Sequence, residues 1–241
     1  MRKPNDDEID DEPIEPARLP TDPDDLPRGA KPPRQRRSQD TIERIVAAAT
    51  ELLDGRPFDE IPILEIVDRA GVSTSSFYAR FPNKEVLLTY LHERHLRSMR
   101  QAADFAIANH VWDEMSVSQI VRQLVSIYLS HRRAKEPLLR TFMHAALEDP
   151  SYLARRTASD QYVIGVITDY LAARLVRDGM PVAFDHVALV VLVVTSAIKD
   201  ATSAPEQFVA RFRLRDEALV DGLSAMACAH LGVADDGAPV R

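Results

Sequence analysis

A short apolar segment, a glycine and a second short segment rich in hydroxyl side chains follow one another between residues 63 and 80. The first segment, Ile63–Ala70, has helical apolar spacing, and Gly71 follows it where a helix end favours glycine. Phe77 and Phe81 are four residues apart, so both fall on one helix face and can pack inward. Ser, Thr and Tyr occupy the other positions from 73 to 78 and can face bases and phosphates. This order predicts a helix-turn-helix.

Three strings in and after this segment resemble the DNA-binding domain of the TetR family of bacterial regulators. They are Ala70-Gly71-Val72-Ser73, Phe77-Tyr78 and Phe81-Pro82-Asn83-Lys84-Glu85. The resemblance runs from about Ser38 to about Leu96, roughly a quarter of the chain. It implies an all-α homodimer with an N-terminal three-helix helix-turn-helix domain and a larger C-terminal helical domain that binds an effector and dimerises. It also implies a transcriptional repressor that a small molecule releases from a palindromic operator.

The resemblance and the basic character of residues 31–37 together give a set of expected DNA-binding residues. The recognition helix is expected over about 74–80, with Ser73 as its N-cap. Flexible basic arms in other helix-turn-helix proteins follow phosphates or enter the minor groove. The expected DNA contacts are Arg34, Arg36, Arg37, Ser73, Thr74, Ser75, Ser76, Tyr78, Arg80 and Lys84. Pro62 stands where relatives usually have Ser or Thr, and Leu64 where they often have a polar residue, so neither is assigned a DNA contact.

The charge distribution agrees with a DNA-binding segment although the chain has a net charge of −7. Residues 1–30 hold ten acidic and four basic residues, whereas residues 31–100 hold twelve basic and ten acidic ones. The sign therefore changes where the motif begins. Residues 1–33 are acidic, rich in proline and poor in large apolar side chains, so we expect a disordered tail there.

Composition beyond the tail favours helices. The chain has 8 glycines and 16 prolines, and half of the prolines lie between Pro4 and Pro33. No run of 18 apolar residues occurs, and no signal sequence is recognisable, so no membrane span is expected and a cytoplasmic location fits. Cys228 is the single cysteine and is expected in the core.

Four segments are expected along the chain: a tail over 1–33, the DNA-binding domain over 34–85, the effector-binding and dimerisation domain over 86–233, and a flexible end over 234–241. Helices of the third segment are expected from about 83 to 107 and near 116–132, 136–148, 151–178, 183–203 and 206–231. The run from Val187 to Val194 has strand propensity, but its apolar pattern continues through Ile198, so we expect a helix.

Aromatic residues of the C-terminal segment are candidates for an apolar effector cavity. They are Phe105, Trp112, Tyr128, Phe142, Tyr152, Tyr162 and Tyr170. The helices near 183–203 and 206–231 are expected to pair with their symmetry mates in a four-helix bundle, because their apolar surface exceeds what one protomer can cover. The expected dimer interface is Val187, Val190, Val191, Val194, Leu219, Leu223 and Met226.

No pattern in the sequence favours an enzyme. His92 and His95 flank Glu93, but zinc proteases need histidines four apart, so we interpret this segment as a solvated helix face. Catalytic serine, phosphate-loop and paired-cysteine motifs are absent from the sequence, and neither a cofactor nor a metal is expected. The alternative to a DNA-binding regulator is a helical dimeric interaction protein whose helix-turn-helix no longer binds DNA.

Overall fold

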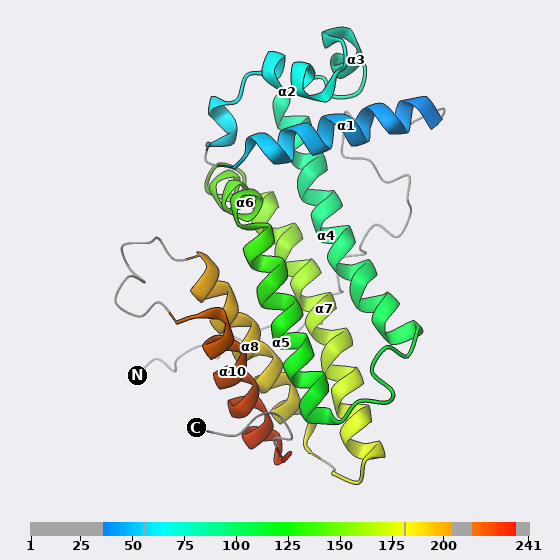
Figure 1. Cartoon of the computed structure of the whole chain (residues 1–241), viewed down its shortest axis with the longest axis vertical. Helices are drawn as coiled ribbons and strands as arrows, with labels where there is room; N and C mark the ends of the chain where they lie inside the picture. Colours follow the sequence, from blue (N-terminus) through cyan, green and yellow to red (C-terminus); the bar gives the residue numbers. More distant parts are fainter. Residues whose placement is uncertain (1–35, 55, 181, 204–213, 235–241) are drawn as a thin grey trace, which may run out of the picture.

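The computed structural model describes residues 36–54, 56–180, 182–203 and 214–234, which form helices and connecting loops without a strand among them (Figure 1). The expected acidic tail, the basic residue Arg34 and the end of the chain from residue 235 lie outside the described residues. In Figure 1 the N-terminal helices lie across the top of the molecule, and the helices of the rest of the chain run down from them as a bundle.

The N-terminal unit consists of α1 (Arg36–Leu52), a single 3₁₀ turn (Phe58–Glu60), α2 (Ile63–Ala70) and α3 (Thr74–Tyr78). The expected apolar face of the first helix is buried, with Ile45 and Ala49 fully inaccessible. Phe77 and Phe81 also have no exposed surface, which confirms that they hold the second helix of the motif from inside.

The turn between α2 and α3 has the geometry that the glycine predicts. Gly71 has φ of +61°, in the left-handed region that side chains with a Cβ rarely adopt. The Val72 N–H donates to the Val67 carbonyl at 3.0 Å and the Gly71 N–H to the Asp68 carbonyl at 3.1 Å, which is a Schellman end. Arg44 of α1 donates to the Gly71 carbonyl at 3.1 Å and so fixes the turn to the first helix.

Helix α4 (Lys84–Ala108) leaves the N-terminal unit and runs along the bundle (Figure 1). The Asn83 side chain caps its first turn by accepting from the Val86 N–H at 2.9 Å. A bidentate ion pair joins it to α1, with Arg94 donating to both Glu43 oxygens at 2.5 and 2.7 Å. One continuous helix therefore contacts both parts of the chain.

The bundle continues with α5 (Val117–Ala134), α6 (Glu136–Glu148), α7 (Pro150–Arg177), α8 (Phe184–Ser203) and α10 (Asp216–Leu231). A capping box between Ser116 and Gln119 begins α5. Residues 187–194 lie within α8, which confirms the helix and excludes the strand. Two predicted boundaries are wrong: the recognition helix ends at Tyr78 rather than Arg80, and the last helix begins at Asp216, with residues 206–213 outside the described part.

Buried apolar side chains form two clusters. The first surrounds α1 to α3 and also takes in Leu138 and Phe142 of α6 and Tyr152 of α7. The second lies among α5, α7, α8 and α10 and includes Cys228, which is 1% exposed as expected of a core residue. No helix of the described residues is long and apolar enough to cross a membrane.

The second cluster contains most of the residues that were expected at the dimer interface. Val187, Val190, Val191 and Leu223 are buried inside the protomer itself, and Val194 and Leu219 are partly buried against the same cluster. They pack there because α5 and α7 lie against α8 and α10 and cover these faces. The large apolar side chains that α8 and α10 leave exposed are Phe184, Leu189, Leu192, Val193 and Met226.

Candidate DNA-binding surface and ligand cavity

The exposed face of α3 carries the side chains expected to meet DNA. Thr74, Ser75 and Tyr78 are exposed, and Tyr78 retains 49% of its accessible surface. The Tyr78 ring contacts the buried Phe77 ring edge-on at 5.5 Å between centroids. Its hydroxyl therefore extends from a ring that the core holds in place.

Local hydrogen bonds engage three other expected DNA contacts, Ser73, Ser76 and Arg80. The Ser73 hydroxyl caps α3 by accepting from the Ser76 N–H at 3.2 Å and also bonds the Ser76 hydroxyl at 2.8 Å. Arg80 is partly buried and donates to the Ser76 carbonyl at 3.0 Å. All three residues support the helix geometry in this state, and their contact with DNA stays a prediction.

Lys84 stands at the first position of α4, where unpaired backbone N–H groups favour an anion. Its Nζ lies 4.7 Å from the centroid of the Phe58 ring. Partial burial lowers the pKa of Lys84, while nearby Asp59 and Glu85 act in the opposite direction. The position is compatible with the predicted phosphate contact.

The expected basic arm is described only in part. Arg36 and Arg37 form the start of α1, but their side chains, like the whole of Arg34, lie outside the described part of the chain. Their contact with DNA also stays a prediction.

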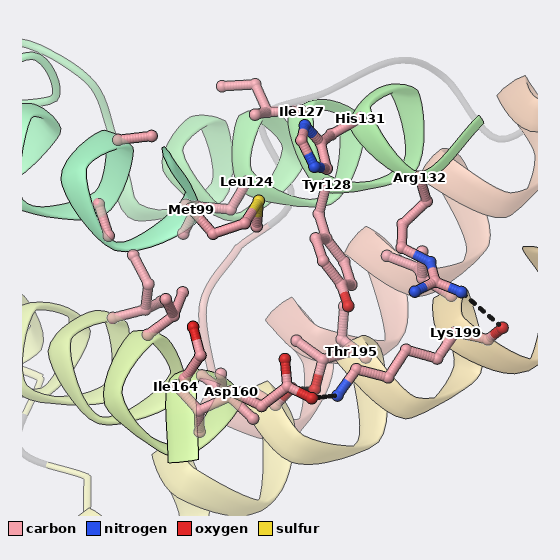
Figure 2. A pocket seen from close by; sticks show the side chains of 18 of the residues that line it. Met99, Leu124, Ile127, Tyr128, His131, Arg132, Asp160, Ile164, Thr195 and Lys199 are labelled. Atoms are coloured by element: carbon pink, nitrogen blue, oxygen red, sulfur yellow. Dashed lines mark hydrogen bonds and ion pairs between the residues drawn. The ribbon is translucent and has the colours of Figure 1, made fainter. Parts of the chain in front are cut away.

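A cavity of about 380 Å³ lies inside the C-terminal bundle (Figure 2). Its walls come from α4, α5, α6, α7 and α8, with Trp112 from the loop before α5 and Ala227 from α10. The volume falls within the roughly 300–1,000 Å³ typical of small-molecule sites. Most of the lining is aliphatic or aromatic.

The structure brings four of the candidate aromatic residues to the cavity: Trp112, Tyr128, Phe142 and Tyr152. The other three do not line it. Phe105 is 64% exposed on α4, Tyr162 is exposed and donates to Asp104 at 2.8 Å, and Tyr170 packs beside Trp112 at 5.2 Å between ring centroids. Sequence spacing placed six of these seven on helices and Trp112 between two helices, but it did not assign them to a common interior face.

The interpretation of His92 and His95 as solvated is wrong. His92 is 1% exposed, and both rings line the cavity together with His131 of α5. Burial, with neighbouring Arg155 and other cations, lowers the pKa of His92 to about 3, and burial with His131 lowers that of His95 to about 4. The spacing of Leu88, His92, His95 and Met99 follows one helical face, which is a signal that could have placed both histidines inside.

These histidines do not form a metal site with other groups. Among the described residues, no three side chains of His, Cys, Asp or Glu are placed to hold a metal ion. At neutral pH the three imidazoles are polar, uncharged parts of the cavity wall. Nδ1 of His92 and Nε2 of His131 are buried and have no hydrogen-bond partner among the described residues.

Four charged side chains line the cavity, and sequence reasoning found none of them: Arg132, Arg156, Asp160 and Lys199. Figure 2 shows Lys199 extending to Asp160, with the Tyr128 hydroxyl directed toward this pair. The Lys199 Nζ lies 2.7 Å from the Asp160 carboxylate, and the Arg156 Nε lies 3.6 Å from it. They were missed because α5, α7 and α8 contribute them from distant parts of the sequence.

The cavity adjoins the N-terminal unit. The His92 ring packs on Phe142 and Tyr152 at 4.7 and 4.9 Å between centroids, and both partners also belong to the apolar cluster around α1 to α3. The Tyr152 hydroxyl bonds Thr89 of α4 at 2.9 Å. The same side chains thus line the cavity and support the helix-turn-helix.

Comparison with known proteins agrees with this arrangement. Residues 45–91 match the sequence model of the bacterial regulatory proteins of the tetR family. The HTH-type transcriptional regulator EthR of Mycobacterium tuberculosis is 38% identical over 69 residues, which cover 29% of this chain and 32% of EthR. An uncharacterized HTH-type transcriptional regulator of Mycobacterium bovis is 26% identical over 136 residues, 56% of this chain and 65% of that protein. The helix-turn-helix segment of this chain is therefore similar to that of TetR-family regulators.

Solved structures extend the likeness in fold beyond the matched segment. A TetR-family regulator from Mesorhizobium loti has a TM-score of 0.64 at 16% identity, over 82% of this chain and 98% of its own. GusR of Salmonella enterica has a TM-score of 0.55 at 15% identity, over 80% of this chain and 95% of its own. The TetR-family fold therefore covers both the helix-turn-helix and the bundle. The sequence match to EthR spans only about a third of that protein.

Proposed function

We propose that this chain is a TetR-family transcriptional regulator that binds duplex DNA and is controlled by a small molecule. One observation carries the proposal: a helix-turn-helix with exposed Thr74, Ser75 and Tyr78 rests on the same packed side chains that line a ligand-sized cavity. Hydroxyl groups discriminate bases weakly, so thymine methyl contacts and DNA shape would contribute to sequence preference.

The exposed apolar face of α8 and α10 supports a homodimer. Leu189, Leu192 and Val193 of α8 and Met226 of α10 are 46–63% exposed, and a shallow depression between the two helices is lined by three of these four. Pairing this face with a second copy makes a four-helix contact with two-fold symmetry. Two symmetry-related α3 helices then read a palindromic operator when they lie about 34–36 Å apart, one turn of DNA.

Repression relieved by an effector follows from the position of α4. This helix begins with Lys84 beside the motif and carries His92, His95 and Met99 along the cavity wall. A ligand that binds more tightly to a state with another α4 orientation shifts the population toward it. The separation of the two α3 helices changes with that orientation, and operator affinity falls.

Selection of bound sequences from random duplex DNA tests the proposal. The expected result is a two-fold symmetric sequence bound with a steep salt dependence, because phosphate contacts release counterions. Recovery of no enriched sequence, with weak binding that is the same for all duplexes, would contradict it.

The second candidate is an interaction protein without DNA binding. Two departures favour it: Pro62 precedes α2 without a side-chain capping bond, and Leu64 is 64% exposed on α2. Because the phosphate term of DNA binding depends on salt, an absence of salt-dependent duplex binding by a folded dimer would favour this candidate.

A further inference from the structure

The charges that face the cavity do not balance. Arg132, Arg156 and Lys199 are cationic, Asp160 is the one carboxylate among the described lining residues, and the lowered pKa values keep His92 and His95 neutral. Asp160 is engaged by both Lys199 and Arg156. A cationic ligand would have to compete with two existing ion pairs for it.

Among these three cations, Arg132 is the one that forms no ion pair with a carboxylate of the described residues. Its side chain is 8% exposed, and it donates to Thr202 at 2.9 Å, to Ser203 at 2.5 Å and to the Lys199 carbonyl at 3.5 Å. These acceptors are all uncharged, and no carboxylate of the described residues forms an ion pair with it. A buried guanidinium without a counter-ion is costly, and an anion beside it lowers that cost.

Uncharged polar groups also line the cavity. Burial raises the pKa of Tyr128 to about 12, so its hydroxyl keeps its proton and can donate. The Nε2 atom of His131 and the Nδ1 atom of His92 are both buried, and neither has a hydrogen-bond partner among the described residues. Both can satisfy an oxygen atom that enters the cavity.

The rest of the wall suits an apolar body. Met99, Leu124, Ile164 and Ile198 are among its aliphatic residues. Ile127, Met143 and Leu153 line the cavity and are also 44–54% exposed, so the cavity reaches solvent between α5, α6 and α7 along an apolar path. A chain of methylene groups can lie there with its polar end at Arg132.

We propose that the cavity selects an amphipathic anion, an apolar chain that ends in a carboxylate held near Arg132. This inference rests on the proposed function, since it names the chemical class of the effector. It distinguishes the cavity from one built for apolar cations or for uncharged lipophiles.

The experiment compares three ligands of equal chain length: dodecanoate and dodecyltrimethylammonium, each below its micelle-forming concentration, and 1-dodecanol below its solubility limit. Trp112 is the single tryptophan of the chain and lines the cavity, so its fluorescence reports binding without DNA. Dodecanoate is expected to bind at least tenfold more tightly than either of the others. Equal or tighter binding of the alcohol or the cation overturns the proposal, as does an unchanged Trp112 signal with all three.

A pair of neighbouring variants tests the position of the head group. Arg132→Gln removes the charge but keeps hydrogen-bond donors. It should lower the affinity for dodecanoate about tenfold and change the affinity for dodecanol less than twofold. Arg133→Gln is the matched control, since Arg133 pairs with Asp216 and does not line the cavity. Equal weakening of both ligands in Arg132→Gln would show a structural effect and overturn the assignment. The comparison of the three ligands on the unmodified protein tests the proposal independently of this variant.

Addition of each ligand to the complex with the selected duplex separates the two proposals. If dodecanoate binds selectively but the DNA complex persists, the ligand class stands and effector control fails. If dodecanol releases DNA as well as dodecanoate does, effector control stands and the ligand class fails.

Discussion

Acid should destabilise this protein through its buried histidines, and His92 allows the effect to be calculated. The pKa of His92 is lowered from 6.5 to about 3, first by burial and then by Arg155 and Arg156 of α7 and His95 of its own helix. The unfolded chain therefore binds this proton below pH 6.5 while the folded protein does not. The stabilising contribution is complete above pH 6.5 and is lost as the pH falls toward 3.

The magnitude follows from the interval between the assay pH and 6.5. At pH 5 the loss is about 1.5 pKa units, or about 2 kcal/mol for His92 alone. For a chain of this size, that corresponds to about 4–8 °C in melting temperature. His95, whose pKa is lowered to about 4, contributes in the same direction and in the same pH range.

The variant His92→Phe tests this value because it keeps an aromatic ring against Phe142 and Tyr152 and removes the titrating group. Melting followed by circular dichroism at pH 7.5 and pH 5.0 should show a drop about 4–8 °C smaller than in the parent. His144→Phe, at an exposed histidine of α6, is the control and should keep the parental drop. An undiminished drop in His92→Phe would refute the buried, neutral state assigned to this imidazole.

Three further predictions concern DNA binding and assembly. Tyr78→Ala should weaken operator binding by about 1–3 kcal/mol. Lys84→Ala should lower the affinity for all duplexes alike and reduce the slope of log affinity against log salt concentration by about one unit. Anisotropy titration measures both effects. Deletion of residues 1–30, which carry a net charge of −6, should raise nonspecific DNA affinity and leave the melting temperature nearly unchanged, since that segment competes with phosphates for the basic residues that follow. Met226→Arg should yield folded monomers in sedimentation because Met226 is 63% exposed, whereas Leu223→Arg should unfold the protomer because Leu223 is 9% exposed.

The N-terminal motif could be predicted closely because its determinants are local. Gly71 at a helix end, Ser73 as a cap and the inward pair Phe77 and Phe81 each depend on neighbours within a few residues. Helix boundaries in the bundle were also predicted well, since α6 spans the expected 136–148. Capping residues and prolines mark such ends in the sequence itself.

The interior faces of the bundle could not be predicted in the same way. A helix such as α8 has apolar residues on most of its surface, so the sequence does not say which of Val187, Leu189, Val190 and Leu192 face the protomer's own core. That choice depends on how α5, α7 and α10 pack against it. The polar end of the cavity was missed for the same reason, because Asp160 and Lys199 meet only after two helices pack.

The packing around Phe142 and Tyr152 explains why a ligand in the cavity should affect the DNA-binding unit. Both side chains face the cavity and also belong to the core around α1 to α3. Packed interiors resist gradual deformation and tend to change between discrete arrangements. A ligand that displaces the His92 ring must therefore either repack these two aromatic residues or move α4, which Thr89 and Arg94 join to α7 and α1. Either response changes the support of α3, so we expect operator affinity to depend on the side chain at position 152 even though Tyr152 is remote from DNA. Tyr152→Phe removes only the bond to Thr89 and is the mildest test. It should change the dodecanoate concentration that releases the protein from its operator. The affinity of the DNA-free protein for dodecanoate should stay within about twofold of the parent value.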